Sequence, residues 1–394
     1  MTRGKTNAAT SGNGRHQSAD ALTLTPVSKN GKSKPILITG GAGFVGSNLA
    51  HRLLSSGQRV RLLDNLSRAG VERNLRWLIE THGDLVDIEV PDVRNLTIVK
   101  QAVKDASQVF HFAAQVAVTS SLVDPIEDFE INARGTLNLL EAVRAADNPP
   151  PLIFTSTNKV YGNLADLQFE KQGSRYAPLN DEIRERGINE DRALDFHSPY
   201  GCSKGAADQY VTDYARTYRL PALVFRMSCI YGPHQYGNED QGWVAHFLIR
   251  SISGKPITIY GDGLQVRDIL FIDDLVDAFL LAQQQMKKLA GNAFNIGGGP
   301  ANSISLLELL DLLADLHGGD VSVRFENWRA ADQRYYVADT SKFNGLTAWR
   351  PRVPVHEGVR RLYEWIRTGD EQFAAERVRV ASLPAARTVA AAKC

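Results

Sequence analysis

The chain of 394 residues has few cysteines, almost no net charge and no long apolar run. Its three cysteines are Cys202, Cys229 and Cys394, and such a sparse, odd set argues against a disulfide framework and for a reducing, cytoplasmic compartment. The formal net charge of +1 gives no reason to expect a nucleic acid or a membrane surface as partner. No apolar run approaches the roughly 18 residues of a membrane-spanning helix. None of the nine histidines has a metal-ligand spacing, so no metal site is expected.

Composition separates a folded part of the chain from two ends of different character. Residues 1–34 are rich in Gly, Ser, Asn, Thr and Lys without apolar periodicity, which predicts a flexible tail. The part that follows is too long for one small domain. We expect a first domain over residues 35–225 and a second, interleaved domain mainly over 226–368. Residues 369–394 are expected to be a peripheral tail.

Short apolar runs rich in β-branched residues alternate with helical patterns through the first domain. Strands are predicted at 34–40, 59–65, 85–90, 108–114, 151–157 and 221–226, and helices at 41–57, 96–105, 129–146 and 199–217. This alternation predicts an α/β fold with a doubly wound parallel sheet of the Rossmann type and a smaller C-terminal α/β domain. In the second domain we expect a strand at 254–263 and amphipathic helices at 273–286 and 305–318.

A glycine pattern, TGGAGFVG, lies between the first predicted strand and the first predicted helix. Gly40 permits a tight turn, Gly43 lets a pyrophosphate approach the backbone, and Gly46 allows the helix to pack closely on the strand. Asp64 lies about twenty residues on, at the end of the second strand, where an acid binds a ribose 2′-hydroxyl and repels a 2′-phosphate. The pattern therefore predicts a bound NAD rather than NADP, although Arg68 nearby would weaken the preference.

Tyr200 and Lys204 lie four residues apart in HSPYGCSKG, where the helix predicted over 199–217 begins. The spacing places both side chains on one helix face. An ammonium close to a phenol favours the phenolate and lowers the pKa of the tyrosine. Ser198 as N-cap and Pro199 as first helical residue suit a helix start. Downstream of a dinucleotide loop, the pair indicates a tyrosine general base that deprotonates a substrate hydroxyl.

Over about residues 35–365 the chain resembles the extended short-chain dehydrogenase/reductase family, in the motifs above and in FHFAAQ (110–115), NARGTLNLLEAV (132–143) and YGDGLQVRDILFIDDLVDAF (260–279). Within that family it resembles the CDP-paratose 2-epimerases, also called CDP-tyvelose epimerases, in TSTNKVYG (155–162), SPYGCSKG (198–205), SCIYGPHQYGNEDQGWVAHF (228–247) and RAADQRYYVADTSK (329–342). The resemblance implies an NAD-dependent nucleotide-sugar isomerase with a CDP-linked substrate. It also implies a homodimer or homotetramer built on a four-helix contact.

The resemblance implies roles for single residues as well. Thr157 would hydrogen-bond the reacting hydroxyl, Tyr200 would be the general base, and Lys204 would hold the nicotinamide ribose and tune the tyrosine. The expected NAD-binding residues are Gly40, Gly43, Phe44, Val45, Gly46, Asp64, Asn65, Asp92, Val93, Phe112, Ala113, Ala114, Gln115, Tyr200 and Lys204. Pro91 replaces the glycine that usually precedes the acidic residue after the third strand. The expected substrate-binding residues are Thr157, Asn158, Lys159, Gln241, Trp243, Arg267 and Arg329, and the two arginines would grip the diphosphate.

The pair Asn158 and Lys159 bears most directly on the kind of reaction. The family's dehydratases carry Asp-Glu at these positions and its decarboxylases carry a Glu at the second. An amide and an amine cannot supply that acid and base. What remains is transient oxidation of a sugar carbinol and return of the hydride to the opposite face. The resemblance places this inversion at the 2-position of CDP-paratose, which would give CDP-tyvelose.

Two alternatives stay open. The first is an NAD-dependent 4-epimerase of a UDP- or GDP-hexose, although Cys229 stands where UDP-galactose epimerases carry an asparagine. The second comes from another class, an NAD-binding regulatory protein without turnover. The intact set of Thr157, Tyr200 and Lys204 argues against it, because a sensor has no need of a base.

Overall fold

The computed structural model describes residues 33–329 and 332–381. Nearly all of the predicted N-terminal tail and the last part of the predicted C-terminal tail lie outside the described residues. The first part of the C-terminal segment is helical, because α14 (Val355–Ala381) continues through it. Among the described residues, no helix is long and apolar enough to cross a membrane.

A seven-stranded sheet in the order β12-β8-β5-β4-β1-β2-β3 forms the centre of the molecule, and every neighbouring pair is parallel. Its strands are β1 (Ile36–Thr39), β2 (Val60–Leu63), β3 (Val86–Glu89), β4 (Gln108–His111), β5 (Leu152–Thr157), β8 (Ala222–Met227) and β12 (Ala293–Ile296). The predicted Rossmann-type α/β fold is confirmed. The strand order reverses between β1 and β4, and doubly wound sheets bind ligands outside the carboxyl ends of their strands at such a point.

Alternate side chains of the central strands enter two hydrophobic cores, one on each face of the sheet. Ile36 and Ile38 belong to one core and Leu37 to the other, as the two-residue period of a strand requires. All four residues of β1 are buried. Burial on both faces explains why the sequence shows continuous apolar runs rather than alternation.

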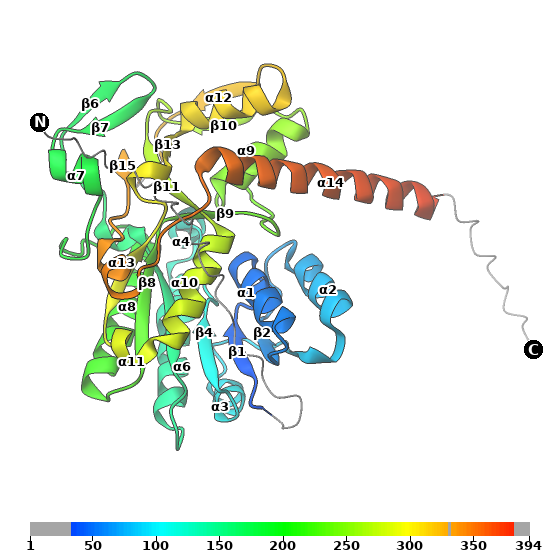
Figure 1. Cartoon of the computed structure of the whole chain (residues 1–394), viewed down its shortest axis with the longest axis vertical. Helices are drawn as coiled ribbons and strands as arrows, with labels where there is room; N and C mark the ends of the chain where they lie inside the picture. The colour runs from blue at the N-terminus through cyan, green and yellow to red at the C-terminus, as the bar shows by residue number, and fades with distance from the viewer. Residues whose placement is uncertain (1–32, 330–331, 382–394) are drawn as a thin grey trace, which may run out of the picture.

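Helices cover both faces of the sheet (Figure 1). On one face, α3 (Leu96–Lys104), α6 (Gly135–Arg144) and α8 (Ser198–Thr217) pack together, and on the other α1 (Phe44–Ser55) packs against α2 (Val71–His82) and α10 (Ile272–Gln284). The helix predicted over 129–146 is less regular than expected. After α4 (Val118–Val123) and α5 (Pro125–Phe129), a π-helical segment, η2 (Glu130–Arg134), leads into α6. Such segments are rare and often occur at functional sites.

The smaller elements gather at the end of the sheet where β1 ends (Figure 1). They are β6 (Phe169–Gln172), β7 (Arg175–Pro178), α7 (Asp181–Arg186), β9 (Cys229–Tyr231), α9 (Trp243–Ile252), β10 (Ile257–Tyr260), β11 (Val266–Phe271), β13 (Ser303–Ser305), α12 (Leu306–His317), β14 (Val323–Glu326) and β15 (Tyr335–Tyr336). The short remaining elements are η1 (Gly83–Leu85), η3 (Asn158–Tyr161), α11 (Met286–Leu289), η4 (Pro300–Asn302) and α13 (Ser341–Thr347). The strand and both helices predicted for the second domain are present as β10, α10 and α12, but α10 packs on the central sheet.

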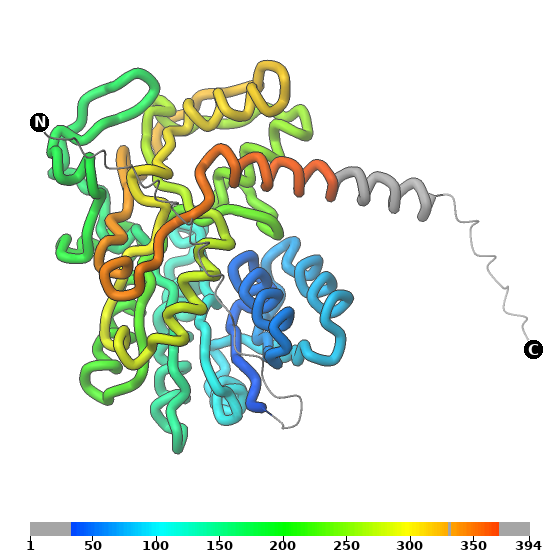
Figure 2. Tube along the Cα trace, viewed as in Figure 1, coloured from blue at the N-terminus to red at the C-terminus, as the bar shows by residue number. Residues whose placement is uncertain are grey.

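The chain passes between the two groups of elements more than once. After β8 it enters the smaller group, and it returns to the sheet as α10 and β12 (Figure 2). Helices α1 and α10 therefore pack against each other although they are far apart in the sequence. The domain boundaries expected from the sequence stay a prediction. Because the two groups interleave, segments from the second half of the chain lie against the carboxyl ends of strands from the first half.

Candidate functional site

A cavity of ≈ 460 Å³ lies between the carboxyl ends of the central strands and the smaller elements. Phe44 and Val45 line it from the start of α1, and Tyr200 lines it from α8. All the residues predicted to bind substrate line it as well: Thr157, Asn158, Lys159, Gln241, Trp243, Arg267 and Arg329. The fold thus brings together residues from segments that are far apart in the sequence.

The loop between β1 and α1 has the geometry that a bound pyrophosphate needs. Gly40 has φ +68°, and a Cβ there would lie 2.7 Å from the backbone nitrogen of Ala113. A Cβ on Gly46 would collide with the Gly40 carbonyl, so only glycine permits this packing. Gly43 is the N-cap of α1, and the helix starts without a side-chain cap or an acidic residue in its first turn. Its first N–H groups and the positive end of its dipole are therefore available to an anion.

Asp64 follows β2 beside this loop. Its carboxylate accepts hydrogen bonds from the backbone N–H groups of Ala42 and Leu66, both at 2.9 Å. Burial raises the pKa of Asp64, while these backbone hydrogen bonds and the charge of Arg68 act to lower it. Each carboxylate oxygen has a further lone pair that can accept from a ribose hydroxyl.

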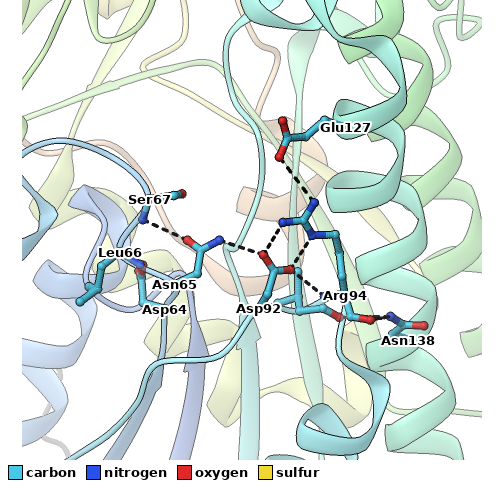
Figure 3. A network of polar contacts seen from close by, with 9 residues as sticks. Asp64, Asn65, Leu66, Ser67, Asp92, Arg94, Glu127 and Asn138 are labelled. Atoms are coloured by element: carbon cyan, nitrogen blue, oxygen red, sulfur yellow. Dashed lines mark hydrogen bonds and ion pairs between the residues drawn. The ribbon is translucent and has the colours of Figure 1, made fainter.

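A polar network joins the ends of β2 and β3 (Figure 3). Arg94 donates from Nε and NH2 to the two oxygens of Asp92 at 2.9 and 2.8 Å, and Asn65 donates to Asp92 at 2.9 Å. The hydrogen bond from Arg94 is the largest cause that lowers the pKa of Asp92, to about 2. Arg94 also reaches Glu127 at 3.5 Å. The side chain of Val93 is instead buried in the core, and its carbonyl accepts from the Asn138 side chain at 3.2 Å.

The segment after β4 passes close to the glycine loop. Ala113 N–H donates to the Thr39 hydroxyl at 3.3 Å, while Phe112 and Ala114 beside it are half-buried. Gln115 exchanges two hydrogen bonds with the Asn132 side chain, at 2.9 and 3.1 Å.

Asn132, which the sequence reasoning did not single out, does not line the cavity but links segments that do or that lie beside it. It lies in the π-helical segment η2, and its Nδ2 also donates to Asp128 at 3.2 Å and to Ser203 at 3.0 Å. Asn132 thereby joins the segment after β4 to α8, the helix that carries Tyr200. The NARG stretch quoted for the family resemblance is the signal that could have pointed to it.

Tyr200 and Thr157 meet where α8 begins and β5 ends. The predicted N-cap is wrong by one residue, since α8 begins at Ser198 and His197 is its N-cap, without a side-chain hydrogen bond. The Ser198 hydroxyl, in a residue with φ +65°, still accepts a hydrogen bond from Gly201 N–H at 3.2 Å. The Tyr200 phenol and the Thr157 hydroxyl both line the cavity and lie close enough to interact. Burial raises the pKa of Tyr200 to about 12, the Thr157 hydroxyl acts to lower it, and the charge of Asp128 acts to raise it.

Lys204 lies one turn after Tyr200 and points toward β5. Its Nζ donates to the Thr155 carbonyl at 2.7 Å and lies 4.3 Å from the centre of the Phe154 ring. Burial lowers the pKa of Lys204 to about 7, and the charge of Asp208 acts in the opposite direction. In the protein without NAD, burial of the phenol therefore raises the Tyr200 pKa more than Lys204 lowers it.

Asn158 and Lys159 lie in the short turn η3 that follows Thr157. The Asn158 amide accepts from the Thr157 hydroxyl at 3.3 Å and donates to Gln333 at 3.5 Å. Lys159 Nζ lies 3.8 Å from Asp332 Oδ1. Burial lowers the pKa of Lys159, and the charge of Asp332 opposes that shift. The turn is thus tied to residues 332–333 of the smaller group.

Two arginines reach the cavity from the smaller group. Arg267 NH2 donates to Asp332 Oδ1 at 2.7 Å. The Arg329 guanidinium lies over the Tyr260 ring, 3.8 Å from its centre, and donates to the Glu239 carbonyl at 2.9 Å. Both guanidinium groups are therefore held in place by protein partners while they line the cavity.

The loop before α9 and the first residue of that helix form another wall of the cavity. Gln241 exchanges backbone hydrogen bonds with Asn238 at 2.9 and 3.2 Å. Trp243 begins α9, and its ring packs edge-on against Phe247 at 5.6 Å. Over the part of the chain that the structure describes, no group of three or more His, Cys, Asp or Glu residues is placed to hold a metal ion.

Comparison with known proteins identifies the family. Residues 36–297 match the NAD dependent epimerase/dehydratase family. The chain is 45% identical over 339 residues to a CDP-paratose 2-epimerase of Salmonella typhi, covering 84% of this chain and 98% of that protein. It is 32% identical to dTDP-glucose 4,6-dehydratase 1 of Escherichia coli (strain K12), covering 84% of this chain and 92% of that one. The UDP-glucuronic acid 4-epimerase of Bacillus cereus, solved with UDP-glucuronic acid and NAD, is similar with a TM-score of 0.73 and 28% identity over 85% and 99% of the two chains.

The geometry and the comparisons agree on the cofactor. The glycine turn, the uncapped start of α1 and Asp64 beside it fit NAD, which confirms the cofactor expected from the sequence. The chain belongs to the NAD dependent epimerase/dehydratase family.

Proposed function

We propose that the protein inverts the configuration at the 2-position of CDP-paratose, through a transient keto sugar, to give CDP-tyvelose. The observation that carries this proposal is the similarity to the Salmonella typhi CDP-paratose 2-epimerase, which extends over nearly the whole of that protein. The cavity adds chemical support, since it joins a Tyr–Thr pair with an amide and an ammonium group where the family's dehydratases carry two acids.

NAD, when bound, supplies the acceptor and later the donor of the hydride. In the proposed mechanism Tyr200 takes the proton of the sugar hydroxyl and afterwards returns it. Thr157, which lines the cavity beside the phenol, would hold the same sugar oxygen. Because burial opposes ionisation of Tyr200, a positive charge beside the phenol is required. Lys204, on the same face of α8, would provide it and would hold the cofactor's ribose.

The residues proposed to hold NAD surround the carboxyl ends of β1, β2, β3 and β4. The turn Gly40–Gly43–Gly46 and the start of α1, with Phe44 and Val45, would bind the pyrophosphate. Asp64 and Asn65 would bind the adenosine ribose. Asp92, Val93, Phe112, Ala113, Ala114 and Gln115 would line the rest of the site.

Asn158 and Lys159 favour epimerisation over dehydration of the keto sugar. Elimination of water needs a positioned acid and base. Both ends of the Asn158 amide are engaged, with Thr157 and Gln333, and an amide does not titrate. Lys159 is an ammonium beside Asp332 rather than a carboxylic acid. The keto sugar would therefore stay intact until the hydride returns.

The proposed assembly is a homodimer or homotetramer, as the family resemblance implies. Large apolar side chains are exposed along α4 and α5: Val123, Ile126 and Phe129 have 86%, 76% and 50% of their surface accessible. These helices pack against α8, so the family's four-helix contact would cover them. The proposed location is the cytoplasm, in keeping with Cys202 and Cys229, which are both free thiols.

The proposal is tested by offering CDP-, UDP- and GDP-linked sugars to the enzyme in D2O and following the products by NMR. Inversion at the 2-position of CDP-paratose without deuterium uptake is expected. Inversion of a UDP- or GDP-hexose at the 4-position would replace the proposal with the 4-epimerase alternative. Tightly held NAD with no turnover of any sugar would favour the regulatory alternative.

Tyr200→Phe should lower the rate of epimerisation by about 10²–10⁴, the usual contribution of a general acid–base group, while nucleotide binding is kept. Tyr210→Phe is a matched control, because Tyr210 lies on the same helix with 44% of its surface exposed. Normal turnover by Tyr200→Phe would refute the role of the phenol.

A further inference from the structure

Lys159 lines the cavity two residues after Thr157 and has no part in the proton transfers above. Its Nζ lies 3.8 Å from Asp332 Oδ1, the same oxygen that accepts from Arg267 at 2.7 Å. The Lys159 side chain is 21% exposed and that of Arg267 only 9%. Of the two cations that share this carboxylate, the ammonium is thus more open to a ligand.

Two cations, Lys159 and Arg267, face the single carboxylate of Asp332. The other arginine of the cavity, Arg329, is balanced by Glu239 at 3.5 Å. Asp240 also lines the cavity, but it lies in the exposed loop before α9. The two cations that share Asp332 lie on the inner side, next to Thr157. A charge withdrawn from water attracts a counter-ion more strongly than one at the surface.

We propose that Lys159 binds the β-phosphate of the nucleotide sugar, the phosphate that carries the sugar, and so selects the sugar carbon that reaches Thr157 and Tyr200. This inference rests on the proposed function. The 2-carbon is bonded to the anomeric carbon, which carries the phosphate, whereas the 4-carbon lies across the ring. An enzyme that oxidises the 2-carbon must therefore bring the phosphate close to its tyrosine. A cation two residues after Thr157 meets that requirement.

Asp332 is the positioning residue of this arrangement. It is fixed by the hydrogen bond from Arg267 and lies beside the Lys159 ammonium. An ammonium has three N–H donors, so Lys159 can donate to a phosphate oxygen while it stays next to Asp332. A carboxylate at position 159, as in the family's dehydratases, would repel both Asp332 and the phosphate.

The binding test compares nucleoside diphosphates with monophosphates, using calorimetry on the enzyme with NAD bound. Lys159→Met should weaken binding of CDP about tenfold to a hundredfold, the effect of a hydrogen bond to a charged group, and leave CMP binding unchanged. Lys159→Arg should keep most of the CDP affinity. If Lys159→Met does not fold, Lys159→Gln carries the same expectation. Equal losses for CDP and CMP, or no loss for CDP, would overturn the role of Lys159.

Lys171→Met is the matched control. Lys171 also pairs with an aspartate, Asp262, at 3.5 Å, but it lies on β6 with its side chain 65% exposed and does not line the cavity. Lys171→Met should leave the affinities for CDP and CMP unchanged.

The same experiment with UDP and UMP separates this inference from the proposed function. Tighter binding of UDP than CDP by the unchanged enzyme would count against the proposed substrate. It would not affect the conclusion on Lys159, because each diphosphate–monophosphate pair tests the phosphate contact by itself. If Lys159→Met binds UDP no more tightly than UMP, the contact between Lys159 and the β-phosphate is supported whichever nucleotide base the substrate carries.

Discussion

The ion pair between Asp208 and Arg226 joins α8 to β8 one turn after Lys204. Arg226 donates from Nε and NH2 to the two oxygens of Asp208, both at 2.9 Å, and from NH1 to the Tyr161 hydroxyl at 3.1 Å. Only 6% of the Arg226 side chain and none of the Asp208 side chain are exposed. Burial lowers the pKa of Arg226, but the hydrogen bonds and charge of Asp208 outweigh it and raise that pKa.

Asp208→Asn keeps the shape of the side chain and removes its charge. It leaves a buried guanidinium without a counter-charge, which should lower the free energy of unfolding by about 3–5 kcal/mol. Asp213→Asn is the control on the same helix, because Asp213 pairs with Arg216 at 2.6 Å while both side chains are exposed. It should cost less than about 1 kcal/mol. Urea unfolding, read from the shift of the midpoint at constant slope, measures both.

The same substitution should also move the pH dependence of turnover. Burial lowers the pKa of Lys204 to about 7, and Asp208 is the main charge that opposes this lowering. Without Asp208 the pKa of Lys204 falls further, so the ammonium is lost at a lower pH. The alkaline limb of kcat/KM should therefore shift to lower pH in Asp208→Asn and stay in place in Asp213→Asn. Equal losses of stability in the two variants, with the alkaline limb unmoved in both, would refute the reasoning.

Two further predictions concern the glycine loop and the assembly. Gly43→Ala should fold normally but bind NAD much more weakly, because the new Cβ meets only the Gly40 carbonyl, at 3.2 Å, and would face the pyrophosphate. Gly46→Ala, whose Cβ would collide with the backbone of the loop, should lower the melting temperature even without NAD; equal melting temperatures for the two variants would contradict this. Ile126→Asp should convert the proposed dimer to monomers in light scattering, whereas Ile79→Asp, on the exposed face of α2, should not. A dimer that persists in Ile126→Asp would exclude α4 and α5 as the interface.

Local patterns were enough to predict six of the seven strands of the central sheet and the loop that follows β1, whereas β12 (Ala293–Ile296) was not predicted as a strand. A strand buried on both faces shows its character within a few residues, and Gly40 and Gly46 mark places where the backbone approaches too closely for a side chain. The start of α8 is equally local, because the Ser198 hydroxyl accepts a hydrogen bond from Gly201 N–H only three residues away. Such features depend on neighbours in the sequence, so the sequence alone predicts them.

Features that depend on distant partners could not be predicted in this way. Asn158 bonds to Gln333 across 175 positions, and nothing near either residue indicates the pairing. The hairpin of β6 and β7 was not predicted, since it is short, and β6 is largely exposed with no apolar alternation. The effect of burial on the Tyr200 pKa likewise depends on the whole fold, whereas the spacing to Lys204 is visible in the sequence.

The contacts of the turn after Thr157 show that the choice between elimination and epimerisation involves more than the residues at 158 and 159. Asn158 is matched to Gln333, and Lys159 to Asp332, whose carboxylate Arg267 holds. An Asp-Glu pair in the same turn would place a carboxylate against Asp332 and leave Arg267 to hold two competing acids. The segment at 332–333 and the turn are therefore adapted to each other. The charge of Lys159 complements that of Asp332, whereas an acid at position 159 would be repelled by it. The partners of the turn thus disfavour an acid pair, in addition to the absence of acids at positions 158 and 159.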